Sequence, residues 1–274
     1  MPYHLYQLIN FSLRTSAYED MRSFHAKTNN VFLFKGDPLT EHRSKTSKIK
    51  QAEVKKVEHS DLPLVLHEGG RVDLSAHLPL ENDFLRDKSA YAFKKKAYDA
   101  FDLFKLLHSS FGETVDKAGN ILRPYPSAGA LYPVQVIVAV RAPQLDNATH
   151  LVNGFYHYRP HLKALDLLTQ ASEEKMIELC FPENDSSLQN FNFCLIYVVH
   201  AAKSFFKYSY RSYRLSLLEV GSMYQQASLV GKQVGLKNRV LSGFADYELA
   251  KIMGLNPSVF FPAIIQVFGI SENS

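Results

Sequence analysis

Two strongly apolar runs limit what this chain can fold into. Residues 134 to 141 read Val-Gln-Val-Ile-Val-Ala-Val-Arg, and a second apolar run extends from Phe191 to Ala201. Apolar segments of this length, bounded by loop residues, predict buried strands. The chain has 274 residues, 46% of them hydrophobic, so it can bury a full core around such strands.

The segments around these runs predict helices and further strands. Apolar residues at helical spacing predict a helix from 98 to 111 that ends at Gly112, and Ser172 opens a second helix to 179. The longest helix is expected over 213 to 234 with a Schellman ending at Gly235. We also expect a hairpin from 154 to 158 and 164 to 168, a short helix from 247 to 253 capped by Asp246, and a last strand from 260 to 269.

The order of these elements bears on the fold class. Strands and helices alternate irregularly along the chain, so we predict an α+β sandwich with a mainly antiparallel central sheet flanked by helices, in preference to a doubly wound sheet. Two glycines inside the longest helix, Gly221 and Gly231, lower its stability and predict close backbone packing there.

Charge and cysteine usage exclude several classes of protein. The net charge of +4 is too small for a dedicated nucleic-acid binder. Cys180 and Cys194 follow no Cys-x-x-Cys spacing and are expected to be buried thiols, and no metal site is expected. We find neither a signal sequence nor an apolar stretch of about 18 residues, so we expect a cytoplasmic protein without a membrane partner. Rossmann, P-loop, zinc-protease and serine-hydrolase motifs are absent as well.

Residues 1 to 80 have weak periodicity and are predicted to form an N-terminal extension to a main domain at 81 to 274. The extension contains six basic residues between Arg43 and Lys56 against one acid, Glu53. This segment is either a solvated face or a docking surface for a partner subunit.

A loop of small residues precedes the first buried run. Residues 123 to 133 read Arg-Pro-Tyr-Pro-Ser-Ala-Gly-Ala-Leu-Tyr-Pro. The prolines fix the backbone, while Ser127 to Ala130 offer backbone N–H groups with little side chain in front of them. Such a loop can lie flat against a planar ring that is rich in hydrogen-bond acceptors. The alternative is a rigid turn that only feeds a core strand.

A second segment, Phe-Phe-Lys-Tyr-Ser-Tyr-Arg-Ser-Tyr-Arg at 205 to 214, lies between a buried strand and the longest helix. Desolvation of Lys207 would disfavour its ammonium form, and a cation beside Tyr208 would favour the phenolate, so either group can act as a base. The alternative is a solvent-exposed strand end with alternating aromatic and basic residues that has no catalytic role. Stacking on single-stranded nucleic acid is a further alternative, which no basic face elsewhere supports.

These segments resemble those of one flavoprotein family. The pattern Lys207-Tyr208-x-Tyr-Arg-x-Tyr-Arg, then Glu219-x-Gly-Ser-Met-Tyr-Gln, Gly235-Leu-Lys-Asn-Arg-Val and the loop at 123 to 133, is similar to azoline dehydrogenase subunits of microcin B17-type thiazole/oxazole synthetases, within the nitroreductase-like superfamily. The resemblance implies a nitroreductase-like α+β fold, FMN at a homodimer interface, and oxidation of peptide thiazolines and oxazolines with dioxygen as electron acceptor.

The resemblance also implies roles for individual residues. Lys207 and Tyr208 would act together as the catalytic base. Tyr91 replaces a second arginine of the phosphate clamp, for which Arg123, Lys237 or Arg239 could substitute. The residues expected to hold FMN are Lys88, Ser89, Arg123, Pro126, Ser127, Ala128, Gly129, Ala130, Gln225, Arg239, Ser242 and Gly243.

The partners implied by the resemblance are a second copy of the chain, a YcaO-type cyclodehydratase subunit, a leader-binding subunit, and a precursor peptide rich in Gly, Ser and Cys. Two other functions stay open at this point. One is a free-standing NAD(P)H-dependent nitro or quinone reductase, and the other is a non-catalytic scaffold subunit.

Overall fold

The structure is a computed structural model that describes residues 13, 15–28, 87–148, 150–181 and 188–271. By internal contacts the chain divides into two units, residues 1–31 with 86–274, and residues 32–85. The second unit lies outside the described residues, and so does the basic segment from Arg43 to Lys56.

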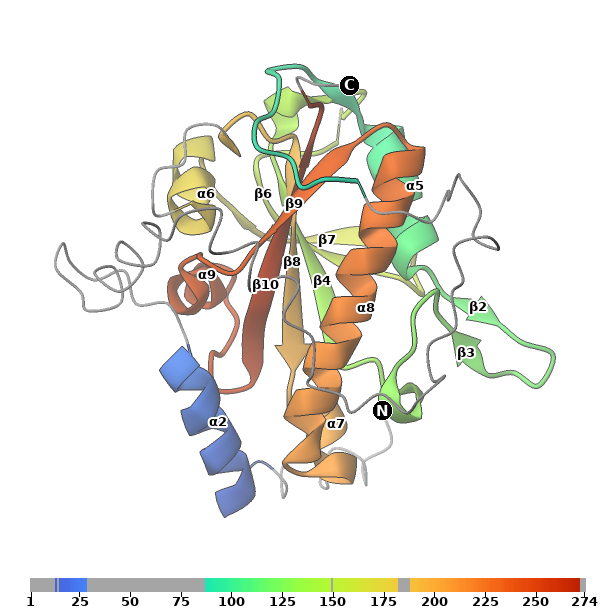
Figure 1. The fold of residues 1–274 in the computed structure, drawn as a ribbon, viewed down its shortest axis with the longest axis vertical. Helices are drawn as coiled ribbons and strands as arrows, with labels where there is room; N and C mark the ends of the chain where they lie inside the picture. Colours follow the sequence, from blue (N-terminus) through green and yellow to red (C-terminus); the bar gives the residue numbers. More distant parts are fainter. Residues whose placement is uncertain (1–12, 14, 29–86, 149, 182–187, 272–274) are drawn as a thin grey trace, which may run out of the picture. The chain divides into compact units, whose positions relative to one another are not determined.

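A six-stranded sheet forms the centre of the first unit (Figure 1). Its strand order is β7-β6-β4-β8-β10-β9, and every neighbouring pair is antiparallel. The strands are β4 (Val134–Val140), β6 (Gly154–Arg159), β7 (Ala164–Gln170), β8 (Phe193–His200), β9 (Lys237–Leu241) and β10 (Phe260–Gly269). The predicted antiparallel sheet and the hairpin of β6 and β7 are therefore confirmed.

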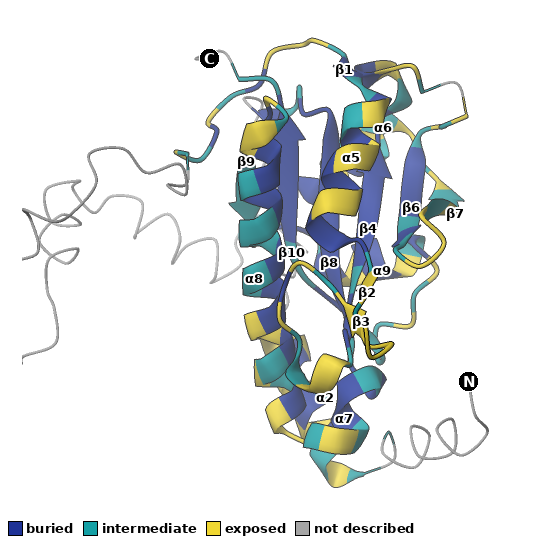
Figure 2. Ribbon diagram, turned by 90° about the vertical axis from the view of Figure 1, so that its right-hand side faces the viewer, coloured by how far each residue is buried: buried dark blue, intermediate teal, exposed yellow. Residues whose placement is uncertain are grey.

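The central strands are mostly buried (Figure 2). Alternation of their side chains separates two cores. In β4, Val136 and Val138 face one core while Ile137 and Ala139 face the other, as the two-residue period of a strand requires. Helices α5 (Ala100–Phe111) and α8 (Arg211–Gln233) cover the first face. Helices α6 (Glu173–Cys180) and α9 (Asp246–Ile252) cover the second.

Local signals place the helix ends where the sequence predicts them. Ser172 caps α6 by accepting a hydrogen bond from the Lys175 N–H. Gly235 follows α8 with a φ of 78°, and the Leu236 N–H donates to the Gly231 carbonyl, which confirms the Schellman ending. A Cβ at Gly231 would lie 2.8 Å from the Phe268 ring, so this glycine allows the helix to approach β10 closely.

Several expectations differ from the structure. Asp246 is the first residue of α9, whose cap is Ala245. Gly221 has open space around its Cβ position among the described residues, so packing within the chain does not explain it. Helix α7 (Ala202–Tyr208) and strand β9 were not predicted, because both are short and carry mixed polar and apolar residues.

Helix α2 (Ser16–Thr28) lies within the range that was predicted to be an N-terminal extension, yet it packs with the first unit. The Tyr18 hydroxyl donates to the Ser258 carbonyl at 2.6 Å, and the His25 ring stacks on Phe261 at a centroid distance of 4.3 Å. Helix α2 therefore contacts the start of β10 and the residues just before it.

Short elements frame the loop before β4. Strands β2 (Thr114–Val115) and β3 (Ile121–Leu122) form a separate hairpin, and β1 (Tyr98–Asp99) pairs in parallel with β5 (Leu145–Asp146). The chain leaves β3, passes through the 3₁₀ turns η2 (Ala128–Ala130), and enters β4. A further 3₁₀ turn, η3 (Ala142–Gln144), follows β4.

Candidate active site

The loop before β4 follows a tight path that small residues permit. Gly129, Ala130 and Tyr132 have φ values of 62°, 52° and 47°, in the left-handed region. The Ala130 N–H donates to the Ser127 carbonyl at 3.1 Å, so it is not a free donor for a ligand, contrary to the expectation for this residue. The N–H groups of Ala128 and Gly129 have no acceptor among the described residues.

The loop lies directly against the end of α7. A Cβ built on Gly129 would be 2.5 Å from the Tyr208 hydroxyl and 2.8 Å from the Lys207 Nζ. The structure therefore brings together the two segments that the sequence analysis selected. Lys207 is exposed, so the desolvation that would disfavour its ammonium form is not met within one chain; it belongs to the last turn of a short helix.

Behind the loop stands a buried carboxyl group that sequence reasoning did not assign a role. Glu219 of α8 is 3% exposed, and its Oε2 accepts a hydrogen bond from the Ser127 hydroxyl at 2.5 Å. Its Oε1 accepts from the Val134 N–H at 3.3 Å. An acid between Leu218 and Val220 on a long core helix was the available signal, since a buried carboxylate needs partners.

Burial raises the pKa of Glu219 to about 7. The hydrogen bonds from Ser127 and Val134, together with the charges of Arg123 and Lys203, oppose that rise. Burial and the nearby Arg123 lower the pKa of Lys203, whose Nζ donates to the Tyr132 carbonyl at 2.9 Å. Glu219, Arg123 and Lys203 therefore form a small cluster of charged groups next to the loop, partly shielded from water.

Arg123 belongs to this cluster, and both of its terminal nitrogens have partners within the chain. Its guanidinium pairs with Glu113 at 2.5 Å, donates to the Tyr125 hydroxyl at 3.0 Å and lies 4.4 Å from the Tyr132 ring centroid. It therefore does not join the predicted phosphate residues Lys88 and Ser89 within one chain.

Those phosphate residues gather at the opposite end of the sheet. The Ala90 N–H donates to the Asn238 carbonyl, which holds the segment with Lys88 and Ser89 beside β9. There the Arg239 guanidinium lies 5.3 Å from the Tyr91 ring centroid. Lys237, a third candidate for the clamp, pairs with Asp87 at 2.6 Å.

Strand register fixes the separation of the two groups. The loop enters at Val134, which pairs with Val199, while the Lys88 segment lies beside Asn238, which pairs with Phe268. On β8 these two levels are Val199 and Phe193, six residue steps apart, which is roughly 20 Å at about 3.3 Å per residue. The remaining predicted residues lie between the ends: Gln225 half-buried on α8, and Ser242 and Gly243 in the turn from β9 to α9.

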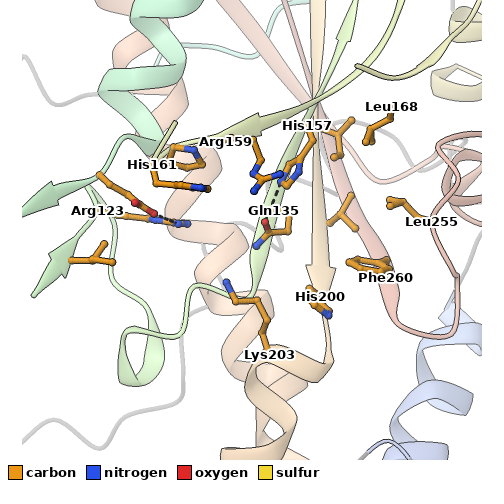
Figure 3. A pocket seen from close by; sticks show the side chains of 15 residues that line it. Arg123, Gln135, His157, Arg159, His161, Leu168, His200, Lys203, Leu255 and Phe260 are labelled. Carbon is orange, nitrogen blue, oxygen red and sulfur yellow. Dashed lines mark hydrogen bonds and ion pairs between the residues drawn. The ribbon is translucent and has the colours of Figure 1, made fainter. Parts of the chain in front are cut away.

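A cavity of about 730 Å³ opens on the face of the sheet that carries α6 and α9 (Figure 3). Arg123 and Lys203 lie on one side of it, and His200, stacked on Phe260 at 4.5 Å, lies on another. Burial lowers the pKa of His200 to about 4, so this imidazole is neutral near pH 7. The cavity is lined neither by the residues of η2 nor by Lys207 and Tyr208.

The described residues contain no group of three or more His, Cys, Asp or Glu side chains that could hold a metal ion. Among the same residues, no helix combines the length and the apolar character needed to cross a membrane.

Comparison with known proteins decides the family. A model of the nitroreductase family matches residues 88–270. The chain belongs to the nitroreductase family. Both predicted ends of the flavin site, the Lys88 segment and the loop before β4, fall inside the match.

A sequence match and a structure match both lead to the microcin B17 system of Escherichia coli. The microcin B17-processing protein McbC is 39% identical over 165 residues, which is 60% of this chain and 60% of McbC. A chain of the microcin synthetase McbBCD complex, solved with truncated pro-MccB17 bound, matches with a TM-score of 0.77 and 31% identity over 97% of both chains.

A more distant structure shares the fold of the nitroreductase family. A protein of Ralstonia eutropha, assigned to the nitroreductases, matches with a TM-score of 0.56 and 22% identity over 76% of this chain and 89% of its own. The predicted nitroreductase-like α+β fold is confirmed.

Proposed function

We propose that the protein is an FMN-dependent oxidoreductase that converts thiazolines and oxazolines of a ribosomally made, microcin B17-like peptide into thiazoles and oxazoles. One observation carries the proposal. Gly129 lies against Lys207 and Tyr208, so two side chains suited to proton transfer adjoin the loop expected to hold the flavin ring. Similarity to McbC and to a synthetase complex that contains a peptide supports the substrate class.

The residues of the loop fit a flavin. The N–H groups of Ala128 and Gly129, which have no acceptor among the described residues, can donate to the acceptor-rich edge of an isoalloxazine, and Ser127 precedes them in the loop. At the other end of the sheet, Lys88 and Arg239 supply positive charge for a phosphate and Ser89 a hydroxyl. Gln225, Ser242 and Gly243 lie between the two ends.

The chemistry needs a base on one side of the azoline ring. When bound, FMN supplies a hydride acceptor and passes the electrons to dioxygen. Tyr208 takes the proton from the ring carbon next to the carbonyl. The Lys207 Nζ lies 5.4 Å from the Tyr208 ring centroid, so the two side chains can act on the same proton. The exposure of Lys207 leaves this side of the loop open to a peptide.

A homodimer would bring the two ends of the site together. In a two-fold dimer the same surface of both copies meets, so the loop of one copy can face the Lys88 segment of the other. Helix α8 offers a surface for this contact: Leu217 and Leu218 are 41% and 65% exposed, and the described residues leave the Cβ position of Gly221 open. Gln225 lies on the same stripe, seven residues after Leu218.

We assign the protein to a synthetase in which a YcaO-type cyclodehydratase makes the azolines and another subunit binds the leader of a precursor rich in Gly, Ser and Cys. The match to a chain of the McbBCD complex supports this assignment.

The test uses the purified full chain and a peptide that carries azolines. We expect visible flavin absorbance, and a loss of about two mass units from the peptide for each ring oxidised. A flavin-containing protein that consumes NADH without peptide would instead indicate a nitro or quinone reductase. A protein that never takes up flavin would indicate a scaffold.

A further inference from the structure

Glu219 holds the flavin loop at two points. Its two carboxyl oxygens accept from the Ser127 hydroxyl and from the Val134 N–H. Ser127 precedes η2 and Val134 begins β4, so Gly129 lies on the segment between these two contacts. The Ser127 Oγ also accepts from the Tyr132 N–H at 2.9 Å, which adds a third hydrogen bond to the same cluster.

We propose that Glu219 is the positioning residue of this loop, and that its protonation releases the Ser127 hydroxyl to donate to a ligand on the open side. The proposal rests on the flavin role of the loop.

The numbers of hydrogen-bond donors and acceptors on Glu219 and Ser127 explain this effect of protonation. An ionised carboxylate only accepts, so Ser127 must donate its single proton to Glu219. A protonated carboxyl can donate to the Ser127 Oγ instead. The serine then keeps its lone pairs for Glu219 and Tyr132, and its proton is free to reach an acceptor of the isoalloxazine. The proton of Glu219 therefore sets the direction of the bond between the two side chains.

The surroundings allow both states near neutral pH. Arg123 and Lys203 favour the ionised form of Glu219, while burial favours the protonated form, and the pKa lies at about 7. Tyr125 adjoins the carboxyl, and Glu113 offsets part of the charge of Arg123. These are the titratable and charged groups that act on Glu219 from the loop, the β2–β3 hairpin and α7.

The experiment measures riboflavin affinity of the flavin-free full chain by fluorescence quenching. Riboflavin is the probe because the phosphate of FMN has its own pKa near about 6. We expect affinity to fall from about pH 6 to about pH 8, by up to roughly tenfold per pH unit above the pKa. Glu219→Gln mimics the protonated carboxyl, since its amide donates to Ser127 and accepts from Val134, so its affinity should not vary with pH. A flat profile in the wild-type protein would overturn the proposal.

Ser127→Ala separates the hydroxyl from the charge. This variant keeps Glu219 and its bond to Val134 but lacks the group that changes direction. We expect its riboflavin affinity to be weaker and independent of pH. A pH dependence equal to that of the wild type would show that the charge of Glu219 acts alone and would refute the role of Ser127.

Hydrogen exchange of the flavin-free protein tests the positioning role without a ligand. Glu219→Ala should raise exchange at the Val134 amide by about fivefold or more, the effect of one lost hydrogen bond, while Glu219→Gln keeps it protected. Unchanged protection in Glu219→Ala would exclude the positioning role. If no flavin binds at any pH, the proposed function fails, and the exchange experiment still decides whether Glu219 holds the loop.

Discussion

Gly129 and Tyr208, which lie on different elements, are so close that a Cβ on the glycine would be 2.5 Å from the tyrosine hydroxyl. No side chain fits at position 129 unless Tyr208 moves. The loop and the Lys207–Tyr208 pair are therefore in direct contact. A change in the loop at Gly129 should alter the positions of these two side chains.

The first prediction concerns this contact. Gly129→Ala should lose most of its bound flavin, because the new Cβ meets Tyr208 and the backbone has a φ of 62°. The left-handed conformation alone costs about 1 to 2 kcal/mol for a residue with a side chain. Visible absorbance of the purified protein and thermal unfolding measure the two effects.

Gly119→Ala is the matched control for Gly129→Ala. Gly119 also has a positive φ, 84°, but no atom of the described residues lies within 4 Å of its Cβ position. It should show the loss of stability and keep its flavin. Equal flavin content in the two variants would mean that the contact with Tyr208 does not shape the site.

The second prediction concerns the chemical step. Tyr208→Phe keeps the ring and removes the hydroxyl, and Lys207→Ala removes the cation beside it. Each should slow azole formation by about 10² to 10⁴, the usual contribution of a positioned general base, without loss of flavin. Mass spectrometry should show accumulated azolines, about two mass units heavier per ring than azoles.

The double variant of Lys207 and Tyr208 should be scarcely slower than the poorer single variant, because the two groups act together. Full azole formation by both single variants would remove the pair from the mechanism. Tyr210, Tyr213 and Arg211 would then be the next candidates.

The third prediction uses the two glycines of α8. Gly221→Ala should raise the dissociation constant of the dimer, since its Cβ would point into open space beside Leu217 and Leu218. Gly231→Ala should destabilise the chain by about 1 to 3 kcal/mol through its contact with Phe268, without a change in dimerisation.

Sedimentation and thermal unfolding distinguish the two glycine variants. A Gly221→Ala protein that dimerises normally, and is only stabilised by up to about 1 kcal/mol through helix propensity, would place the interface elsewhere.

The fourth prediction concerns pH. Burial lowers the pKa of His25 from 6.5 to about 4, so the folded state binds fewer protons than the unfolded state between these values. The stability that depends on neutral His25 is present above pH 6.5 and is lost as the pH falls through 4. His25→Phe keeps an aromatic ring against Phe261 and should reduce this loss by roughly 2 to 3 kcal/mol.

Urea unfolding at a series of pH values measures the effect at His25. His150→Phe, a change at an exposed histidine, should retain the pH dependence of the wild type. The same pH dependence in His25→Phe would show that α2 is not docked through this ring.

The sequence predicted those parts of the fold in which apolar residues follow a strong pattern. Strands β4 and β8 and helix α8 were predicted within two residues at each end, because each is long and has a clear pattern. Strand β9 has no such pattern: it lies at the edge of the sheet, and its five residues are half-buried except Asn238. Its pairing with β10 is a tertiary effect.

The candidate site divides in the same way. The loop and the Lys207–Tyr208 pair were found because they carry unusual residues in a row. Glu219 belongs to one of the segments that resemble the flavoprotein family. Its contact with Ser127 joins residues far apart in the chain, so the spacing of residues in the sequence does not predict it. The same reason explains why Arg123 was assigned to the phosphate, although Glu113 holds it at the other end of the sheet.

In the proposed homodimer, the placement of Lys88 and Gly129 at opposite ends of the sheet has a genetic consequence. Suppose that one copy carries a defective loop and the other a defective phosphate end. A mixed dimer of these copies would concentrate both defects in one site and leave the second intact. Two alleles that are each inactive, such as Gly129→Leu and Lys88→Glu with Arg239→Glu, should therefore restore half of the activity per mixed dimer when expressed together.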